Sequence, residues 1–381
     1  MKEQNYQICK RCIMDTTDPE IRFDENGICN HCKQYDKLAK ERLFTGEVGK
    51  QKLNELVSEI KASGTNKEYD CVVGVSGGVD STFVVYKLKE LGLRPLAVHL
   101  DNGWNSELST RNLEMALKKF NVDLYTYVID WEEFRDLQLS FLKSGISNAE
   151  IPTDHGILAF LLHAAAQRNI KYVIRGNNHA TEGILPVAWG HDAWDLKFLQ
   201  SIHKKFGHIK LKTFPQISLW QRFYYTYVKK IELVSILDYL PYNKKEAIEI
   251  LEKEIGWRPY GGKHCESIYT RFFQSYIIIK RFNFDKRKAH LSALICSGQI
   301  TREQALEEMK RGPYPTEEAM KEDREYVIKK LGLTEEEFEK LMSLPRKTFR
   351  DYPSNYCLMK ILRIIFRVLN KLKITTFIKK L

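Results

Sequence analysis

The stretch SGGVDS at residues 76–81 decides the fold because of what lies on either side of it. It follows an apolar, β-branched run at 71–75 (CVVGV), which is typical of a buried parallel strand. It precedes residues 82–88 (TFVVYKL), whose apolar side chains recur at helical spacing. A glycine pair between a strand and a helix lets backbone N–H groups close around an anion, and the helix dipole favours that anion. We therefore expect a phosphate-binding loop here.

Hydroxyl groups and one acid complete this loop. The residues expected to bind the nucleotide are Ser76, Gly77, Gly78, Asp80, Ser81 and Thr82. The Walker pattern, with Lys-Ser or Lys-Thr after its last glycine, is absent, so γ-phosphoryl transfer is not the natural interpretation.

The motif SGGxDS resembles the pyrophosphate loop of the N-type ATP pyrophosphatases, which include GMP synthetase, asparagine synthetase and tRNA thiolases. In that family the loop holds the β,γ-pyrophosphate while a substrate oxygen attacks the α-phosphorus. The resemblance implies ATP and Mg²⁺, with an adenylated substrate and pyrophosphate as products, and catalytic roles for Ser76 and Asp80. A glycine turn in an unrelated doubly wound sheet is the alternative.

Strand and helix signals alternate over residues 67–215. Strand patterns at 71–75, 95–100, 124–129 and 172–174 are separated by helical patterns at 81–91, 107–120 and 154–168. This alternation predicts an α/β fold, a parallel doubly wound sheet of the adenine nucleotide alpha hydrolase type. Five segments follow: a zinc ribbon at 1–36, a helical connector at 37–66, the ATP pyrophosphatase domain at 67–215, an almost wholly helical substrate or partner region at 216–345, and a basic amphipathic tail at 346–381.

Two cysteine pairs near the start of the chain have metal-binding spacing. They read C-x2-C-x16-C-x2-C, at Cys9, Cys12, Cys29 and Cys32. Four thiolates suit tetrahedral Zn²⁺ and leave no open coordination position, so we expect a structural zinc site. An iron–sulfur cluster is the competing interpretation.

The basic charge of the chain is concentrated at its end. Of the net charge of +11, seven Lys and Arg side chains lie in residues 358–381, which contain no acid; removing them leaves +4 over the first 357 residues. We therefore do not expect nucleic acid as a partner. Eight cysteines without a recognisable secretion signal favour a reducing compartment, so a cytoplasmic protein is expected.

Polar residues follow the second and fourth predicted strands. Asp101 ends the second, where ligands of open α/β sheets bind, so we place it near ATP or its Mg²⁺; a solvated Asp-Asn-Gly turn is the alternative. GMP synthetase-like enzymes have similar segments. By that resemblance Gly176 approaches the nucleotide and Glu182 is a metal-side or phosphate-side acid.

Four further segments narrow the resemblance to a smaller family. IPTDHG at 151–156, NNHATE at 177–182, GWRPYGGKHCES at 256–267 and DKRKAHLS at 285–292 resemble the N-acetyl sugar amidotransferases, as does the cysteine quartet. The resemblance covers roughly residues 6–355. It implies conversion of an acetamido group on a nucleotide-activated sugar to an acetamidino group, in bacterial surface-glycan pathways. Cys265 departs from the family pattern, in which an aromatic residue commonly follows Lys-His.

Basic residues near this third segment are candidates for binding anions. Lys263, His264 and Arg271 are placed to hold sugar-nucleotide phosphates or a carboxylate, because such side chains suit these groups. A basic surface turn after two glycines is the alternative.

The nitrogen source is expected to be a second protein. No glutaminase signature, such as a glycine-flanked cysteine with a distant His-Glu pair, is recognisable in the sequence. The resemblance implies a separate glutaminase with a cyclase-like subunit.

Two other functions remain open. A tRNA thiolase combines the same loop with zinc ribbons, but it needs cysteines near the adenylate, and Cys71, Cys265, Cys296 and Cys357 are scattered singly. A non-catalytic nucleotide-binding scaffold is the third interpretation.

The tail has the pattern of a surface-seeking helix. Lys360, Arg363, Arg367 and Lys371 recur at steps of three and four, and apolar residues cover the remaining arc. This suits a helix lying in an anionic membrane surface. A helix packed on the body or on a partner is the alternative.

Overall fold

Five parallel strands form one sheet in the computed structural model, which describes residues 6–260 and 265–362. Their order is β3-β2-β1-β4-β5, and each pair of neighbours is parallel. The strands are β1 (Cys71–Gly74), β2 (Pro95–Asp101), β3 (Leu124–Val128), β4 (Tyr172–Arg175) and β5 (Glu232–Ser235). The prediction of a doubly wound α/β sheet is therefore confirmed.

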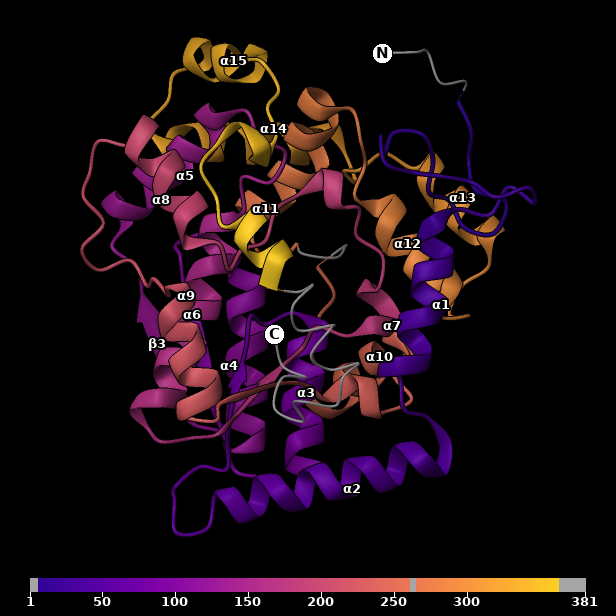
Figure 1. Ribbon diagram of the computed structural model, residues 1–381, viewed down its shortest axis with the longest axis vertical. Coiled ribbons are helices and arrows are strands. Elements are labelled where there is room, and N and C mark those ends of the chain that lie inside the picture. The colour runs from indigo at the N-terminus through magenta and orange to yellow at the C-terminus, as the bar shows by residue number, and fades with distance from the viewer. Residues whose placement is uncertain (1–5, 261–264, 363–381) are drawn as a thin grey trace.

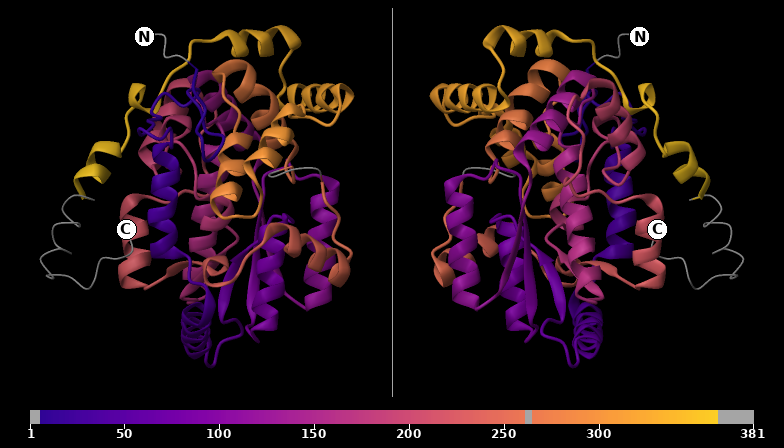
Figure 2. Two further views of the ribbon diagram at one scale, coloured as in Figure 1. Left: turned by 90° about the vertical axis from the view of Figure 1, so that its right-hand side faces the viewer. Right: turned by 90° about the vertical axis from the view of Figure 1, so that its left-hand side faces the viewer.

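The two faces of the sheet belong to two separate cores, because successive side chains of a strand point to opposite sides. Val72 and Val98 pack into one hydrophobic cluster, while Val73 and Ala97 pack into the other. Strand β1 is buried on both faces, as expected for the centre of a parallel sheet. Figure 2 shows helices on both sides of the strands.

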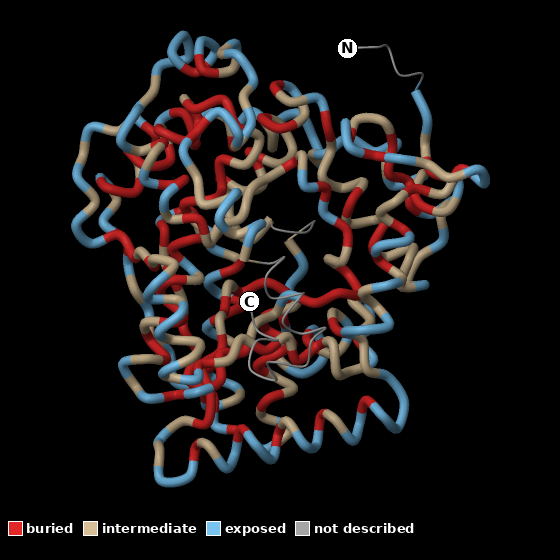
Figure 3. The backbone as a smooth tube through the Cα atoms, in the orientation of Figure 1, coloured by how far each residue is buried: buried red, intermediate tan, exposed pale blue. Residues whose placement is uncertain are grey.

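Helix α6 covers the first face, and α3 lies on the second, with α4 and α10 packed on α3. These helices are α3 (Val79–Glu90), α4 (Glu107–Phe120), α6 (Ile151–Gln167) and α10 (Lys244–Ile255). Helix α2 (Gly46–Ser63) crosses one end of the molecule and buries Leu53, Val57 and Ile60 against the second core (Figure 3).

The other helices gather mainly beyond the carboxyl edge of the sheet (Figure 1). They are α1 (Asn30–Arg42), α5 (Trp131–Ser144), α7 (His179–Glu182), α8 (Leu196–Phe206), α9 (Leu219–Phe223), α11 (Ile268–Phe272), α12 (Arg287–Cys296), α13 (Arg302–Lys310), α14 (Glu317–Leu331) and α15 (Glu335–Ser343). Two π-helical turns, η2 (Tyr224–Val228) and η4 (Phe273–Phe282), extend α9 and α11. Short 3-10 turns are η1 (Val187–Trp189), η3 (Ile236–Tyr239) and η5 (Phe349–Asp351).

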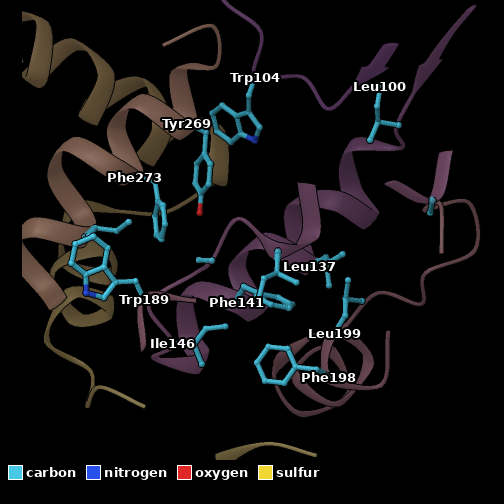
Figure 4. Packing of buried hydrophobic residues seen from close by; sticks show 14 of the residues in the cluster. Leu100, Trp104, Leu137, Phe141, Ile146, Trp189, Phe198, Leu199, Tyr269 and Phe273 are labelled. Atoms are coloured by element: carbon cyan, nitrogen blue, oxygen red, sulfur yellow. The ribbon is translucent and has the colours of Figure 1, made fainter. Parts of the chain in front are cut away.

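An aromatic cluster joins this helical part to the sheet. Trp104, which follows β2, is fully buried, and its ring centroid lies 5.2 Å from that of Tyr269 on α11. Tyr269 in turn stacks on Phe273 at 5.8 Å. Figure 4 shows these rings converging with Trp189 and Phe141. Large aromatic rings bury the most apolar area per residue, so this cluster fixes the helical part on the sheet.

The sequence located four of the five strands and the helices between them. It missed β5, which lies in the region predicted to be almost wholly helical, and that prediction is wrong there. Strand β5 is only four residues long and lies between Lys230 and the turn η3, so its sequence shows no alternation of apolar and polar residues. Its strand conformation depends on pairing with β4. Among the described residues, no helix is long and apolar enough to cross a membrane.

Candidate functional site

The loop after β1 lies where the order of the strands reverses. From β1 the chain proceeds to β2 and β3 on one side, and later to β4 and β5 on the other. Ligands of open α/β sheets bind at such a point, beyond the carboxyl ends of the strands. The SGGVDS loop occupies this position.

Gly77 is required by its surroundings, and Gly78 is closely surrounded. Gly77 has a φ of +77°, and a Cβ there would lie 2.2 Å from the backbone oxygen of Ser109. A Cβ on Gly78 would lie 3.1 Å from the Tyr260 hydroxyl and 3.3 Å from Glu266 Oε1. A side chain at Gly77 would therefore displace backbone, whereas a Cβ at Gly78 would press on the ends of neighbouring side chains.

The serine hydroxyls brace the loop from within. Ser76 N–H donates to Ser81 Oγ at 3.2 Å, and Gly78 N–H donates to Ser76 Oγ at 3.3 Å. Ser81 Oγ donates to the Gly78 oxygen at 3.2 Å. The Thr82 hydroxyl is buried and has no hydrogen-bond partner. All these predicted residues are thus brought together at the N-terminus of α3.

Two aromatic side chains from the segment after α10 hold the same loop. Trp257, 3% exposed, donates from Nε1 to the Gly77 oxygen at 3.2 Å. Val79 N–H donates to the Tyr260 hydroxyl at 3.2 Å. Tyr260 therefore accepts one of the first-turn N–H groups, which at a helix N-terminus are the groups that bind anions.

Asp80 is paired with a buried tyrosine. Its carboxylate accepts a hydrogen bond from the hydroxyl of Tyr242, which is 7% exposed. Burial and the charge of Asp80 raise the pKa of Tyr242 above its usual value. Tyr242 therefore remains a donor at neutral pH and fixes the direction of the Asp80 carboxylate.

Gly176 lets β4 approach the first turn of α3. A Cβ at Gly176 would lie 2.9 Å from Ser81 N and 3.1 Å from Ser81 Cα. The absence of a side chain at Gly176 therefore allows β4 to pack closely against α3, the helix that follows the SGGVDS loop.

A charged group lies at the end of β4. Asp238 accepts a hydrogen bond from His179 N–H at 2.7 Å, and burial raises the pKa of Asp238 to about 6. Burial lowers the pKa of Arg175, and the charges of Glu182 and Asp238 oppose that shift. Glu182 is the last residue of α7, so this predicted acid stands in the same group.

Asp101 is held by a turn at the end of β2. Its Oδ1 accepts from Gly103 N–H at 2.8 Å and from Asn105 Nδ2 at 3.2 Å. Asn105 Nδ2 also lies 3.0 Å from His99 Nε2, and His99 Nδ1 lies 2.8 Å from the Val75 oxygen. The Asp-Asn-Gly turn predicted as the alternative is thus present, and it orients the carboxylate beside the strand that enters the loop.

The start of the C-terminal region is hydrogen-bonded to this turn. Ser106 N–H donates to the Glu266 oxygen at 2.8 Å, and Ile268 N–H donates to the Trp104 oxygen at 2.9 Å. Ser109 Oγ also donates to the Glu266 oxygen, at 3.0 Å. These bonds bring the Glu266 side chain beside Gly78.

Of the three residues predicted to bind anions, the structure describes one. Lys263 and His264 lie outside the described residues. Arg271 is paired with buried Asp323, through Nε at 2.6 Å and Nη2 at 2.7 Å, and Tyr314 donates to the same carboxylate at 3.0 Å. Its guanidinium is committed to this pair, so the structure does not support a phosphate-binding role.

The four N-terminal cysteines form one buried cluster. Their sulfur atoms lie 3.9 Å apart for Cys9 and Cys32, and 3.7 Å apart for both Cys12–Cys29 and Cys29–Cys32. A tetrahedral ion with metal–sulfur bonds of about 2.3 Å has sulfur–sulfur edges of about 3.8 Å. The thiols therefore fit a four-coordinate metal ion.

The C-terminal region also supports this centre. Cys296 Sγ on α12 lies 3.8 Å from Cys32 Sγ, so Cys296 is not the isolated cysteine that the sequence suggested. Arg302 Nε donates to the Cys12 oxygen at 3.0 Å and to the Cys9 oxygen at 3.2 Å. The cysteine cluster is thus fastened to α12 and α13.

Sequence reasoning assigned no role to Tyr242, Trp257, Tyr260 or Asp238. Tyr242 and Tyr260 contact the loop although they lie 162 and 181 residues from their partners along the chain. No local sequence pattern indicates contacts at such separations. The segment at 256–267 was marked by the family resemblance, but its aromatic residues were not singled out.

Comparison with known proteins bears on the C-terminal part of the chain. Residues 266–366 match a family model described as "LPS biosynthesis protein WbpG-like, C-terminal domain". This region is WbpG-like. The match begins at Glu266, the residue that is bonded to the turn after β2.

Two curated proteins are similar in sequence. An uncharacterised protein of Methanocaldococcus jannaschii is 22% identical over 318 residues, which cover 81% of this chain and 95% of that protein. A tRNA(Ile)-lysidine synthase of Chlamydia pneumoniae is 37% identical over 70 residues, which cover 18% of this chain and 22% of that enzyme.

Solved structures give weaker likenesses. The U34-tRNA thiolase NcsA of Methanococcus maripaludis, with its [4Fe-4S] cluster, has a TM-score of 0.32 and 15% identity, covering 79% of this chain and 88% of that one. An NH3-dependent NAD synthetase of Campylobacter jejuni has a TM-score of 0.28 and 18% identity, covering 41% and 72%. Likenesses at this level do not bear on activity.

The cysteine cluster gives a first prediction. Cys9→Ser should lower bound metal well below one ion per chain and lower the Tm by at least about 5 °C, because metal binding energy contributes to folding. Elemental analysis and calorimetry measure both. Exposed Cys357 supplies the control, Cys357→Ser, which should keep its metal. Full metal content in Cys9→Ser would contradict the assignment.

Asp238 gives a second prediction. Its raised pKa means that the folded state keeps a proton that the unfolded chain releases, so stability falls as pH rises from about 4 to about 6 and stays lower above that. Asp238→Asn should therefore be more stable than the parent at pH 7.5, on the order of 1 kcal/mol, with little difference near pH 4. Urea unfolding at both pH values measures this. A constant difference would show that Asp238 does not titrate as described.

Proposed function

We propose that the protein is an ATP-dependent amidotransferase that converts an acetamido group of a nucleotide-activated sugar to an acetamidino group in bacterial surface-glycan biosynthesis. The observation that supports this proposal most is the contact between the SGGVDS loop and the start of the WbpG-like region. A loop of the ATP pyrophosphatase type lies at the switch point of the sheet, and the segment where the WbpG-like region begins is hydrogen-bonded beside it.

The first step activates the amide. An amide carbon resists ammonia because its oxygen is a poor leaving group. In the proposed reaction the acetamido oxygen attacks the α-phosphorus of ATP, the bond to the bridging oxygen breaks, and pyrophosphate leaves. The sugar then carries an imidate-like adenylate.

The second step replaces oxygen by nitrogen. Ammonia adds to the activated carbon, the carbon–oxygen bond breaks, and AMP leaves with both bonding electrons. The net reaction consumes ATP and ammonia and yields the amidine, AMP and pyrophosphate. Positioning of the reacting atoms and fixed dipoles supply most of such catalysis.

The residues of the loop have separable roles in this scheme. The first turn of α3 would hold the pyrophosphate through its dipole, and the N–H groups of Gly78 and Val79 would exchange the Ser76 and Tyr260 hydroxyls for phosphate oxygens. Asp80, oriented by Tyr242, with Asp101 and Glu182, would hold Mg²⁺, which neutralises phosphate charge when bound. Lys263 and His264 remain candidates for binding the sugar nucleotide.

The metal that we propose for the cysteine cluster is zinc, in a structural role. Four thiols at tetrahedral separations leave no open position for catalysis. Iron in stoichiometric amount would refute this part of the proposal.

One observation favours the thiolase alternative. Cys265 immediately precedes Glu266, so a thiol stands near the loop. Burial raises the pKa of Cys265 to about 11, however, so little thiolate is present at neutral pH. Sulfur transfer needs a reactive thiolate, and the amidotransferase remains the better supported function.

The loop gives a third prediction. Ser76→Ala and Asp80→Ala should each lower the formation of AMP and pyrophosphate about 100-fold or more while the fold is kept, since each removes a group that meets phosphate or Mg²⁺. Product analysis with ATP, ammonium and a panel of UDP- and CMP-linked diacetamido sugars measures this, and mass spectrometry detects oxygen replaced by NH.

Two control variants sharpen this experiment. Ser58→Ala, on the exposed side of α2, should be fully active. Cys265→Ser should keep most activity, whereas its complete loss would favour sulfur transfer. Formation of ADP, or normal turnover by Asp80→Ala, would refute the pyrophosphatase chemistry.

The nitrogen source gives a fourth prediction. The purified protein should use a high concentration of ammonium but not glutamine, and addition of a glutaminase partner with its cyclase-like subunit should restore glutamine use. Glutamate release and amidine formation are measured together. Efficient glutamine hydrolysis by the isolated chain would exclude a separate partner.

A further inference from the structure

A fifth thiol lies against the cysteine cluster. Cys296, the last residue of α12, donates a hydrogen bond to Cys32, with 3.8 Å between the two sulfur atoms. Sulfur atoms inside the cluster are 3.7–3.9 Å apart. Cys296 is not one of the four residues whose sulfur atoms all lie within 4.8 Å of one another. An ion bound by those four therefore leaves Cys296 as a thiol beside one of its ligands.

The position of this thiol is set by the packing of α12. Ile13 N–H donates to Ser292 Oγ on α12 at 3.2 Å, and Lys288 Nζ, one turn earlier on that helix, is paired with buried Asp15. Figure 1 shows α12 beside α1, and the two helices are in contact. Since none of these bonds involves Cys296, the contact between its thiol and the cluster follows from how the C-terminal region docks on the cysteine segment.

The thiol of Cys296 is more accessible than those of the cluster. The four cluster cysteines are 0% exposed, whereas Cys296 is half-buried. A small reagent from solution therefore meets Cys296 before it meets Cys32. Cysteines that react reversibly with oxidants are accessible and stand next to a second cysteine that completes a disulfide. Cys296 has both properties.

We infer that Cys296 and Cys32 form a site of reversible oxidation, at which a peroxide converts the two thiols to a disulfide. The disulfide joins α12 to α1 covalently. It also takes Cys32 out of the quartet, so an ion held there keeps three thiolates and is bound more weakly. This inference concerns the cysteine cluster and is independent of the proposed reaction.

The oxidation proceeds in two steps with hydrogen peroxide as the oxidant. The Cys296 sulfur attacks one peroxide oxygen, the O–O bond breaks, and water leaves, which gives a sulfenic acid. The Cys32 sulfur then attacks the sulfenic sulfur, an S–S bond forms, and the S–O bond breaks; the departing hydroxide takes up a proton and leaves as a second water. Two thiols are oxidised and one peroxide is reduced.

The test treats the full-length protein, as purified, with hydrogen peroxide, blocks the remaining thiols by alkylation, and digests it with trypsin without reduction. Trypsin cuts after Lys and Arg, so Cys32 lies in the peptide 23–33 and Cys296 in the peptide 289–302. We expect these two peptides to be linked, with fragmentation assigning the bond to Cys32 rather than to Cys29. Dithiothreitol should separate them.

A matched pair of variants measures the consequence for the metal. Cys296→Ser keeps a hydroxyl that can donate to Cys32, so it should hold as much metal as the parent before oxidation. It should lose metal to peroxide at least about fivefold more slowly, because the accessible thiol is absent. Cys357→Ser removes an exposed thiol and should lose metal at the rate of the parent. A metal-binding dye follows the release.

Three results would overturn the inference. Peroxide could join two cysteines of the cluster and leave Cys296 as a thiol. It could oxidise Cys296 to a sulfinic acid with no linked peptide, in which case Cys32 is not its partner. The third is an equal rate of metal loss in Cys296→Ser and the parent. The linked peptide is measured on the parent protein, so the inference is decided even where Cys296→Ser does not fold.

Discussion

Two backbone hydrogen bonds, from Ser106 to Glu266 and from Ile268 to Trp104, hold the helical C-terminal region to the turn after β2. The rest of the site depends on them. They place Glu266 beside Gly78, and the segment that precedes them brings Trp257 and Tyr260 onto the same loop. A site built in this way is complete only when both regions are docked, because neither supplies all of its walls.

The N-terminal cysteine cluster makes a second junction with the C-terminal region. Arg302 binds the backbone oxygens of Cys9 and Cys12, and Cys296 contacts Cys32. The N-terminal cysteine segment and the helices α12 and α13 therefore meet at one centre. A change in the cysteine cluster should be transmitted to α12 and α13 through these contacts, since Cys9 and Cys12 belong to the cluster by their thiols and bind Arg302 by their backbone oxygens.

How much could be predicted from the sequence depends on the range of the interactions. The SGGVDS loop lies within six residues and the cysteine quartet within the first 32, so local patterns located both. The tyrosines that meet the loop and the Cys296 thiol come from distant segments, and only tertiary packing identifies them. For Arg271 the local sequence is misleading. Its basic side chain suggested anion binding, but its guanidinium is paired with buried Asp323, which lies 52 residues away along the chain.

The contact between Arg302 and the ribbon also has a consequence for synthesis. Cys9 and Cys12 leave the ribosome 293 and 290 residues ahead of the arginine that binds their carbonyl oxygens. At about 5–20 residues per second, this interval is roughly 15–60 s. For that time the thiols are present without the helices that later cover them. In a nascent chain of this protein the four thiols must therefore stay reduced, or bind an ion that fits their geometry, before α12 and α13 exist.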